Sequence, residues 1–408
     1  MPDPTTTQGA LRLPREVRFG YGSRQLTADL VRARGSRVLA LVDPFLIDLP
    51  PVRDVLASVT ARGCAVDECV DVQPELPVAG IAALAERARR ADVVLAIGGG
   101  SVIDAAKLAA MVAVHGGTPA DYYGEGIVPG PVMPVIALPT TAGTGSEVTP
   151  VAVVSDPDRA MKVGVSSPHL VPDVAVVDPE FTVGAPRGVT AFAGIDALVH
   201  ALESFTAAPL EPDPGRVFTG RNVLAEGPAL RAARLLATWL PVAVAEPADR
   251  RARENVALGS LLAGIAFGST GTHLSHALQY PIGTLTKTPH GLGTGLMLPY
   301  VLDACLHDAQ ARGRLAEAAA ALGSAATTEQ DQARDVVRTV AAVAAAIGVP
   351  RTLADIGVRE TDVPELVTHA LAQQRLIGIA PIPVTEATLA GILQRALRGE
   401  LSVPVAAT

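Results

Sequence analysis

The sequence contains few cysteines. Its 408 residues include only three, Cys64, Cys69 and Cys305, and these are scattered along the chain. Three isolated thiols cannot form a disulfide framework or a CxxC metal knot. We therefore expect three reduced thiols, as in a cytoplasmic protein.

The sequence also lacks an excess of basic residues and any long apolar run. It carries 33 lysines and arginines against 41 aspartates and glutamates, a formal net charge of −8. A nucleic-acid partner or an anionic membrane surface would require a basic patch, so we expect neither. Each apolar stretch is interrupted before the roughly 18 residues that a membrane span needs. The first residues show no basic-then-apolar pattern of a signal peptide.

The first half of the chain alternates short β-branched runs with segments of helical periodicity. Such alternation is typical of a parallel sheet with helices on both faces. We therefore predict a doubly wound, mostly parallel α/β domain over residues 1–187. The expected strands are 37–43, 65–72, 92–97, 134–138, 151–154 and 174–177, and the expected helices are 78–91 and 101–115, with Ser101 as the N-cap of the latter.

The pattern changes near residue 185, where β-branched runs give way to alanine and leucine at helical spacing. This periodicity predicts an all-α second domain over residues 188–408. The clearest expected helices are 194–205, 227–240, 253–267, 313–322 and 332–347, and the expected loops are 209–215 and 325–330.

A glycine-rich turn, Gly98-Gly-Gly-Ser-Val-Ile-Asp104, lies between an expected strand and an expected helix. Glycine lets the backbone approach a phosphate without a Cβ clash, and a helix N-terminus offers N–H groups and a positive dipole end. The spacing differs from the G-x-G-x-x-G of the usual dinucleotide fingerprint. The context predicts a pyrophosphate site, with a simple tight turn as the alternative.

Two further features lie where expected strands end. Residues 139–147, Pro-Thr-Thr-Ala-Gly-Thr-Gly-Ser-Glu, are small and rich in hydroxyls. Ligand crevices in such folds lie at the carboxyl ends of strands, so this segment predicts a loop around a polar ligand. Asp43 could accept both ribose hydroxyls of an adenosine and repel a 2′-phosphate. The alternatives are an exposed polar loop and an ordinary strand-end aspartate.

Histidines are few but clustered in the second half. Three of the eight, His273, His276 and His290, fall within eighteen residues. Asp196 and His200 are four residues apart, which places them on one face of a helix. A carboxylate with several imidazoles suits Fe(II), Zn(II), Co(II) or Ni(II) rather than Ca(II). The pattern predicts a metal site, although a single such histidine is more often an ordinary core residue.

Taken in order along the chain, the motifs resemble those of the iron-containing (group III) alcohol dehydrogenases. The matching segments are Phe19–Gly22, Gly98–Asp104 with Lys107, Pro139–Thr149, Lys162 with Ser166–Pro168, Pro172–Pro179, Gly194–Ser204 and Pro289–Gly291. The resemblance implies a dinucleotide-binding α/β domain followed by a helical domain that carries a divalent metal.

The resemblance also implies roles for individual residues. It makes Asp196, His200, His276 and His290 the metal ligands, with Fe(II) as the expected metal and Zn(II) as the alternative. It places Gly98, Gly99, Ser101 and Asp104 on the pyrophosphate, Thr140, Thr141 and Thr144 on the cofactor loop, Lys162 near the nicotinamide, and Asp43 on the ribose. The expected cofactor is NAD, with NADP as the alternative.

Two features depart from the family pattern. Many relatives read His-Ala-x-x-His where this chain reads His276-Ala-Leu-Gln-Tyr280, and the missing histidine is thought to move the alcohol proton. Tyr280 is a poor base at neutral pH, since its reference pKa is about 10. His273, or a chain of water and ribose hydroxyls, is the expected substitute. The connection 207–222 is also longer than usual, and the chain looks nearest to the hydroxyacid–oxoacid transhydrogenase branch.

We therefore expect an NAD(P)-linked oxidoreductase that interconverts a small primary alcohol and its aldehyde or ketone, working as a homodimer or larger homo-oligomer. Residues expected to contact the substrate are Phe267, Arg216, Arg221 and Arg375. An arginine among them could clamp an acidic substrate. The alternatives are a transhydrogenase that retains its cofactor, a dehydroquinate-synthase-like lyase, and a non-catalytic metal or nucleotide sensor.

Overall fold

The computed structural model describes residues 9–73, 76–159, 162–211 and 213–404, and the chain divides into two compact units. The sheet unit comprises residues 12–183 and 214–217. The helical unit comprises residues 1–11, 184–213 and 218–408. The segment 214–217 is held in the sheet unit by Arg12, whose guanidinium donates to the carbonyls of Arg216 and Val217 at 3.1 and 2.9 Å.

The sheet unit is built on six parallel strands, in the order β1-β9-β6-β4-β2-β3. These are β1 (Glu16–Phe19), β2 (Arg37–Val42), β3 (Ala65–Cys69), β4 (Val93–Gly98), β6 (Val135–Pro139) and β9 (Val174–Val177). The prediction of a parallel α/β sheet is confirmed. The expected strand 151–154 forms as β7 (Val151–Val154), but it belongs to a second sheet with β8 (Val163–Ser166) and β5 (Gly124–Glu125).

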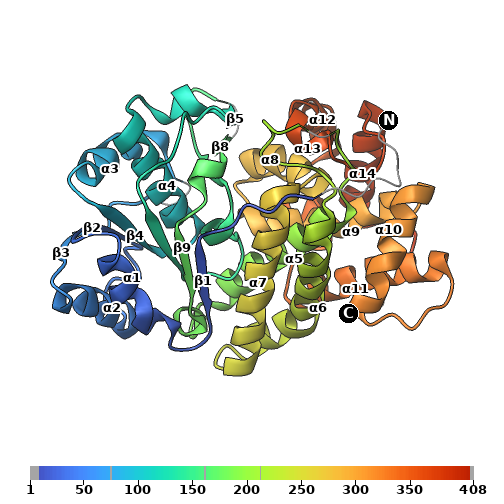
Figure 1. Ribbon diagram of the computed structural model, residues 1–408. Helices are drawn as coiled ribbons and strands as arrows, with labels where there is room; N and C mark the ends of the chain where they lie inside the picture. The colour runs from blue at the N-terminus through green and yellow to red at the C-terminus, as the bar shows by residue number, and fades with distance from the viewer. Residues whose placement is uncertain (1–8, 74–75, 160–161, 212, 405–408) are drawn as a thin grey trace. The chain divides into compact units, whose positions relative to one another are not determined.

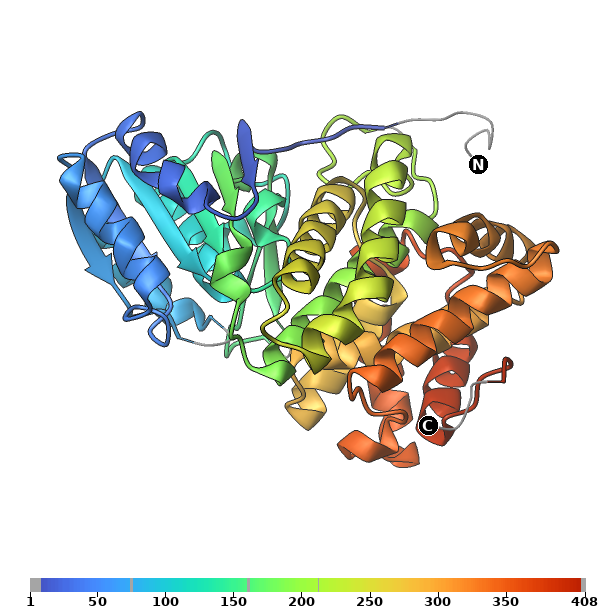
Figure 2. The same cartoon turned by 90° about the horizontal axis from the view of Figure 1, so that it is seen from below.

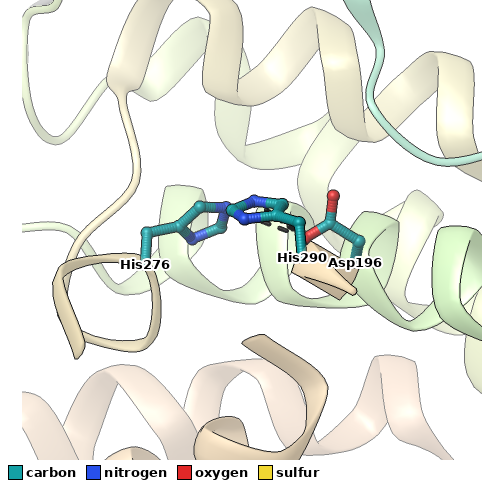
Figure 3. Close-up of side chains that lie close together, drawn as sticks. All are labelled: Asp196, His276 and His290. Atoms are coloured by element: carbon teal, nitrogen blue, oxygen red, sulfur yellow. Dashed lines mark ion pairs between the residues drawn. The ribbon is translucent and has the colours of Figure 1, made fainter. Parts of the chain in front are cut away.

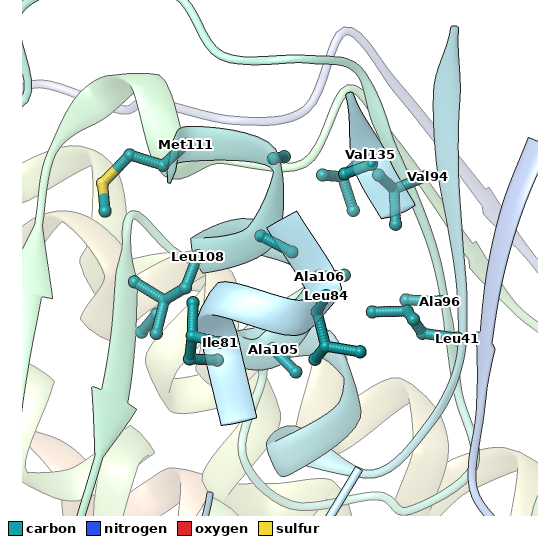
Figure 4. Packing of buried hydrophobic residues seen from close by; sticks show 14 of the residues in the cluster. Leu41, Ile81, Leu84, Val94, Ala96, Ala105, Ala106, Leu108, Met111 and Val135 are labelled. Carbon is teal, nitrogen blue, oxygen red and sulfur yellow. The ribbon is translucent and has the colours of Figure 1, made fainter. Parts of the chain in front are cut away.

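Helices cover both faces of the six-stranded sheet, as side-chain alternation requires. On β2, Val38, Ala40 and Val42 pack with α1 (Thr27–Arg32) and α2 (Pro50–Ala61). Leu39 and Leu41 point to the other face, against α3 (Ile81–Ala88) and α4 (Gly100–His115). Figure 4 shows this second core, where residues of α3 and α4 meet Leu41, Val94, Ala96 and Val135. Both faces are therefore buried, as in doubly wound folds.

The strand order reverses between β2 and β4, because β3 lies outside β2 whereas β6 and β9 lie beyond β4. Ligands of open α/β sheets bind at the carboxyl ends of strands at such a reversal. Asp43 follows β2 directly and donates its backbone N–H to the carbonyl of Ile97 on β4. The predicted ribose and pyrophosphate residues thus lie at adjacent strand ends.

The helix after β4 begins one residue earlier than predicted. Gly99, in an extended conformation, is the N-cap of α4, and the helix starts at Gly100. Ser101 lies in the first turn and is not the cap, so that prediction was wrong. Its physical reason is steric: at Gly98 and Gly100 an added Cβ would lie 2.5 Å from Val102 and 2.7 Å from Thr144. Positions 98 and 100 therefore require glycine, and Gly99 between them is the N-cap.

The helical unit confirms the predicted all-α domain (Figures 1 and 2). Its long helices are α5 (Arg187–Thr206), α6 (Val223–Ala245), α7 (Arg250–Thr270), α8 (Leu274–Thr286), α9 (His290–Cys305), α10 (Ala309–Ala319), α11 (Glu329–Ala346) and α14 (Glu386–Arg398), with shorter α12 (Val363–Leu371) and α13 (Gln374–Ile377). Across 9–73, 76–159, 162–211 and 213–404, no helix combines the length and apolarity needed to cross a membrane.

Helix α5 is the central helix of the helical unit and is buried along most of its length. A Cβ on Gly291 of α9 would lie 2.0 Å from the carbonyl oxygen of Phe192 on α5. One on Gly295 would lie 2.5 Å from Ile195, a turn further along both helices. The two helix backbones therefore approach as closely as glycine permits, and this approach brings the start of α9 against Asp196.

Candidate metal centre

Four predicted ligands from three helices converge in the helical unit. Asp196 and His200 lie one turn apart on α5, His276 lies on α8, and His290 is the first residue of α9. The Asp196 carboxylate is 3.7 Å from Nε2 of His200, 3.8 Å from Nε2 of His276 and 3.7 Å from Nε2 of His290. Figure 3 shows the side chains of Asp196, His276 and His290 pointing toward one another.

This spacing fits one metal ion. Ligand atoms bound to one ion at about 2.0–2.2 Å lie roughly 3–3.5 Å apart, slightly closer than the distances here. Asp196, His276 and His290 each offer one ligand atom, and these atoms all lie within 4.8 Å of one another. Among the described residues, buried Nε2 of His276 has no hydrogen-bond partner. A buried nitrogen lone pair that accepts no hydrogen bond is costly unless it coordinates a metal ion. The residues present therefore fit a bound metal ion.

A buried glutamate determines which nitrogen His276 presents. Glu203, one turn beyond His200 on α5, accepts from Nδ1 of His276 at 2.7 Å and from the backbone N–H groups of His273 and Ser275 at 2.8 and 2.6 Å. Burial alone would raise the pKa of Glu203, but His273 and His276 lower it well below its usual range. The proton on Nδ1 leaves the Nε2 lone pair of His276 for the metal.

His290 and Asp196 are oriented in the same manner by neutral groups. Nδ1 of His290 donates to Oε1 of Gln279 at 2.7 Å, so Nε2 carries the lone pair of the neutral ring. The Thr294 hydroxyl, one turn after His290, donates to Oδ1 of Asp196 at 2.8 Å. The ligand atoms are therefore positioned by hydrogen bonds that exist within the protein itself.

Aromatic rings pack against the histidines of the centre. The ring of Phe267 stacks on His200 with centroids 4.1 Å apart and planes 18° apart. Tyr280 stacks on His290 with centroids 5.8 Å apart and planes 28° apart. The structure therefore brings the predicted Phe267 and Tyr280 to the metal centre.

The geometry of His273 does not suit proton transfer. Its side chain is fully buried, and the Thr206 hydroxyl near its Nε2, at 2.9 Å, also lies 2.7 Å from the Leu202 carbonyl. Because a hydroxyl has one proton and gives it to the carbonyl, it accepts from Nε2 of His273. Nδ1 lies 2.8 Å from the backbone nitrogen of Leu274 and 3.2 Å from Oε1 of Glu203, so both ring nitrogens have partners within the fold. This ring caps α8 and has no nitrogen left for a substrate proton.

The three predicted arginines have different local surroundings. Arg221 pairs with Glu226 at 3.2 Å, and the guanidinium of Arg375 lies 4.6 Å from the ring centroid of Phe218. Arg216 belongs to the sheet unit, whereas the other two belong to the helical unit. The same Glu226 oxygen also pairs with Arg314 at 2.7 Å, so Arg221 shares its carboxylate partner.

In the sheet unit, the predicted cofactor residues surround the start of α4. The backbone N–H of Thr140 donates to the carbonyl of Gly98 at 3.0 Å, which joins the threonine-rich segment to the glycine turn. A Cβ on Gly99 would lie 3.4 Å from Thr141, and one on Gly100 only 2.7 Å from Thr144. The first turn of α4 and the three threonines thus lie side by side.

Asp104, predicted to contact the pyrophosphate, instead bonds within the sheet unit. Its carboxylate accepts from the Ser146 hydroxyl at 2.5 Å and from the N–H of Val153 at 2.9 Å. Burial raises the pKa of Asp104, and the charges of Lys107 and Lys162 partly offset that rise. Lys162 therefore lies near enough to Asp104 to act on its charge. Asp104 anchors the segment that follows the threonines.

Two further observations complete the sheet-unit site. Lys107 is fully buried and donates to the carbonyls of Thr149 and Val151 at 2.9 and 2.8 Å. With Asp104 it ties α4 to the segment 146–153. Oδ1 of Asp43 accepts from the N–H of Phe45 at 2.9 Å, which closes a turn directly after β2.

Sequence reasoning assigned no role to Glu203, Gln279 or Thr294. Glu203 and Thr294 each fall one turn from a predicted ligand, at positions 200 and 290. That helical spacing was a usable signal for both. Gln279 lies three residues after His276 but bonds His290, so its role depends on how α8 packs on α9.

Comparison with known proteins identifies the family. The family model "Iron-containing alcohol dehydrogenase" matches residues 14–179, and "Fe-containing alcohol dehydrogenase family, C-terminal" matches residues 190–397. The chain belongs to the iron-containing alcohol dehydrogenase family. The resemblance inferred from the motifs is confirmed, and the protein is an enzyme of an oxidoreductase family. This assignment favours the dehydrogenase over the lyase and sensor alternatives.

Similar proteins span nearly the whole chain. Long-chain-alcohol dehydrogenase 1 of Geobacillus thermodenitrificans (strain NG80-2) is 36% identical over 393 residues, covering 94% of this chain and 96% of that protein. The mitochondrial hydroxyacid-oxoacid transhydrogenase of Bos taurus is 33% identical over 414 residues, covering 94% and 88%. Proteins similar to this chain thus carry names that refer to different substrates.

Solved structures agree with the fold. A 1,3-propanediol oxidoreductase superposes with a TM-score of 0.89 at 28% identity, covering 96% of this chain and 100% of that one. Sulfoacetaldehyde reductase from Bifidobacterium kashiwanohense, in complex with NAD⁺, gives a TM-score of 0.82 at 29% identity, covering 96% and 99%. The fold of this enzyme family is therefore shared across the whole length.

Proposed function

We propose that this enzyme is a metal-dependent, NAD(P)-linked oxidoreductase that interconverts a small alcohol and its aldehyde or ketone. The observation that carries the proposal is the convergence of three histidine Nε2 atoms on the Asp196 carboxylate, at 3.7–3.8 Å. The family assignment supports the reaction class. The names of the relatives differ in substrate, so the choice of alcohol rests on experiment.

One divalent ion would be held by Asp196, His200, His276 and His290. Fe(II) is the proposed metal and Zn(II) the alternative, since both bind imidazole and carboxylate. Such an ion supplies Lewis-acid polarisation of the oxygen of an alcohol or carbonyl substrate. The protein contributes the fixed directions of the ligand atoms and a largely buried setting, in which charges interact more strongly than in water.

The proposed cofactor is NAD(H), which takes up or gives the hydride. The NAD⁺ complex of the sulfoacetaldehyde reductase supports this proposal. Among the described residues, the buried Thr140 hydroxyl has no hydrogen-bond partner, as expected of a group that would bond to the cofactor. Gly98, Gly99, Ser101, Thr141, Thr144 and Lys162 are the other proposed contacts.

Asp43 is proposed to select NAD over NADP by repelling a 2′-phosphate. Replacing Asp43 with glycine should narrow or reverse the preference, measured as the ratio of kcat/KM for the two cofactors. Equal kcat/KM for both cofactors in the unmodified enzyme would count against this role.

Proton transfer is assigned to neither His273 nor Tyr280. His273 uses both ring nitrogens within the fold, and a phenol is a poorer base than an imidazole at neutral pH. We infer that water and the ribose hydroxyls of a bound cofactor would supply the route for the alcohol proton. Tyr280→Phe should then retain most activity, whereas a loss of about 1000-fold would identify Tyr280 as an acid–base group.

The direct test is a panel of short and long alcohols and their aldehydes, followed at the NADH absorbance, with Fe(II) or Zn(II) added to metal-free enzyme. Metal-dependent turnover of at least one pair is expected, together with its loss in His276→Ala. The same turnover without metal, or unchanged metal content in His276→Ala, would overturn the proposal.

A second candidate, a hydroxyacid–oxoacid transhydrogenase, is favoured by the similarity to the bovine enzyme. It would keep its cofactor through gel filtration and exchange hydride between two substrates without added NAD. An acidic substrate is part of this candidate, and Arg216, Arg221 and Arg375 are its proposed contacts. Comparing 4-hydroxybutyrate with 1-butanol separates the two candidates. The homo-oligomer and the cytoplasmic location remain predictions.

A further inference from the structure

Gln279 occupies an unusual place beside the metal centre. It lies on α8, only 4% exposed, and its Oε1 accepts the Nδ1 proton of His290 at 2.7 Å. His290 is the first residue of α9, where side-chain direction depends on how the chain enters the helix. The family motif His-Ala-x-x-His, which reads His276-Ala-Leu-Gln-Tyr280 in this chain, assigns nothing to position 279. The chemistry of the Gln279 side chain is therefore a separate observation.

Two glycines make room for the Gln279 side chain. A Cβ on Gly283, one turn later on α8, would lie 2.6 Å from Nε2 of Gln279. A Cβ on Gly293 of α9 would lie 2.7 Å from Cγ of Gln279. Both distances are too short for non-bonded atoms, so a side chain at either position would displace Gln279, and the amide fills a slot left by two glycines. The slot aims the amide oxygen at His290.

The two histidines outside α5 are therefore held by chemically different partners. His276 donates to Glu203, a carboxylate, whereas His290 donates to a neutral amide. A carboxylate partner raises the basicity of a ligating imidazole, whereas an amide mainly fixes its tautomer and orientation. His276 is accordingly the stronger donor of the pair, and His290 the weaker but equally well-oriented one.

We propose that Gln279 is a positioning residue of the metal centre, which holds His290 in the tautomer and orientation that present Nε2 to the ion. This inference rests on the proposed metal function. It predicts that metal affinity depends on the hydrogen-bond acceptor at position 279 and rises when that acceptor gains a negative charge.

The test measures Zn(II) and Co(II) affinity by competition with a chelator, and the thermal unfolding of the metal-free protein. Gln279→Met keeps length and apolar volume but removes the acceptor, so affinity should fall roughly 10–100-fold. Gln279→Glu keeps the acceptor and adds charge, so affinity should exceed that of the unmodified enzyme. Gln332→Leu is the matched control: it removes a glutamine amide on α11 that bonds the Ala326 carbonyl, and affinity should not change.

Each variant can refute the proposal independently. Unchanged affinity in Gln279→Met would show that the amide only fills space, as would a loss in Gln279→Glu as large as that in the methionine variant. Should Gln279→Met fail to fold, the glutamate variant alone decides between positioning and space-filling. If His276→Ala binds metal as tightly as the unmodified enzyme, the proposed metal centre itself fails, which is a distinct result.

Discussion

The metal centre of the helical unit and the strand ends of the sheet unit are assembled in opposite ways. In the helical unit, polar side chains bond to one another: Glu203 to His276, Gln279 to His290, and Thr294 to Asp196. In the sheet unit, glycines bring the backbone forward, while Asp104 and Lys107 bond inward to the segment 146–153.

This difference determines what each site tolerates. A site of interlocked side chains is sensitive to the loss of one polar group, because the partner is left buried and unsatisfied. A site of glycines and backbone N–H groups is sensitive to added volume, because the close-packed interior has no space for an additional side-chain atom. The buried glutamates show the same contrast: Glu203 is surrounded by donors, whereas burial raises the pKa of Glu147 in the sheet unit to about 7.

The largest effect is expected for Glu203→Leu. It would leave three buried donors, the N–H groups of His273 and Ser275 and Nδ1–H of His276, without their acceptor. Unfolding free energy should fall by about 3 kcal/mol or more, since each such group costs about 1–3 kcal/mol. Metal affinity should fall roughly 10–100-fold in parallel.

Urea unfolding and chelator competition measure the two effects of Glu203→Leu. Glu329→Gln is the control, because Glu329 pairs with Arg312 at the surface of the same unit. If Glu203→Leu is as stable as the control and binds metal with the same affinity, the site in the helical unit does not depend on its polar side chains as described.

A pH dependence of intermediate size is expected from Glu147. Burial raises its pKa from the ordinary glutamate value of 4.5 to about 7, and its own backbone and Lys107 offset only part of that rise. Between these two pH values the folded state holds a proton that the unfolded state releases. This contribution to stability is complete below the lower value and is lost as pH rises through the upper one, by up to about 3 kcal/mol.

Glu147→Gln should remove that slope, because an amide does not titrate. Urea unfolding at a series of pH values from the ordinary glutamate pKa to about one unit above neutrality compares the variant with the unmodified enzyme. A slope of the same size in both proteins would assign it to other groups, and Glu147 would then resemble Glu203 in being a carboxylate throughout.

The smallest of the three effects is expected for Gly100→Ala. The new Cβ would lie 2.7 Å from Thr144 and would push the threonine-rich segment away from the helix start. Overpacking of this kind costs about 1–3 kcal/mol, so NADH should bind roughly tenfold more weakly. Metal content should not change, because the metal ligands belong to the other unit.

NADH fluorescence titration measures the effect of Gly100→Ala. Gly80→Ala is the matched control, since no atom lies within 4 Å of its added Cβ. A tenfold loss in the control as well, or a loss of metal in Gly100→Ala, would show that the two sites do not differ as described.

The elements that the sequence predicted best are those with strong local patterns. The β-branched runs at 37–42, 93–98 and 135–139 form the centre of the sheet, where both faces are buried. Strand β1 was missed because Glu16–Phe19 is short and carries charged residues. Helices α8 and α9 were missed because Pro281, Pro299 and several glycines interrupt their pattern. The membership of β7 in the smaller sheet depends on pairing partners, which a local pattern does not specify.

The site shows the same division between local and long-range information. The family resemblance implied Asp196, His200, His276 and His290 as the metal ligands, and the structure brings all four together. Whether His273 could move a proton depended on its tautomer, which Thr206 and Leu274 determine. Asp104 was predicted on the cofactor, but Ser146 and Val153, which are distant in sequence, bind its carboxylate.

The close contact of α9 with α5 limits how this enzyme can be altered by evolution or by design. At position 291 any side chain would begin 2.0 Å from the Phe192 oxygen, an atom that cannot move without unwinding α5. If every amino acid is tested at position 291, only the glycine enzyme should keep the fold. A histidine at position 291 therefore cannot take over the role of His290. New substrate specificity must therefore arise around a fixed histidine, from side chains outside this helix crossing.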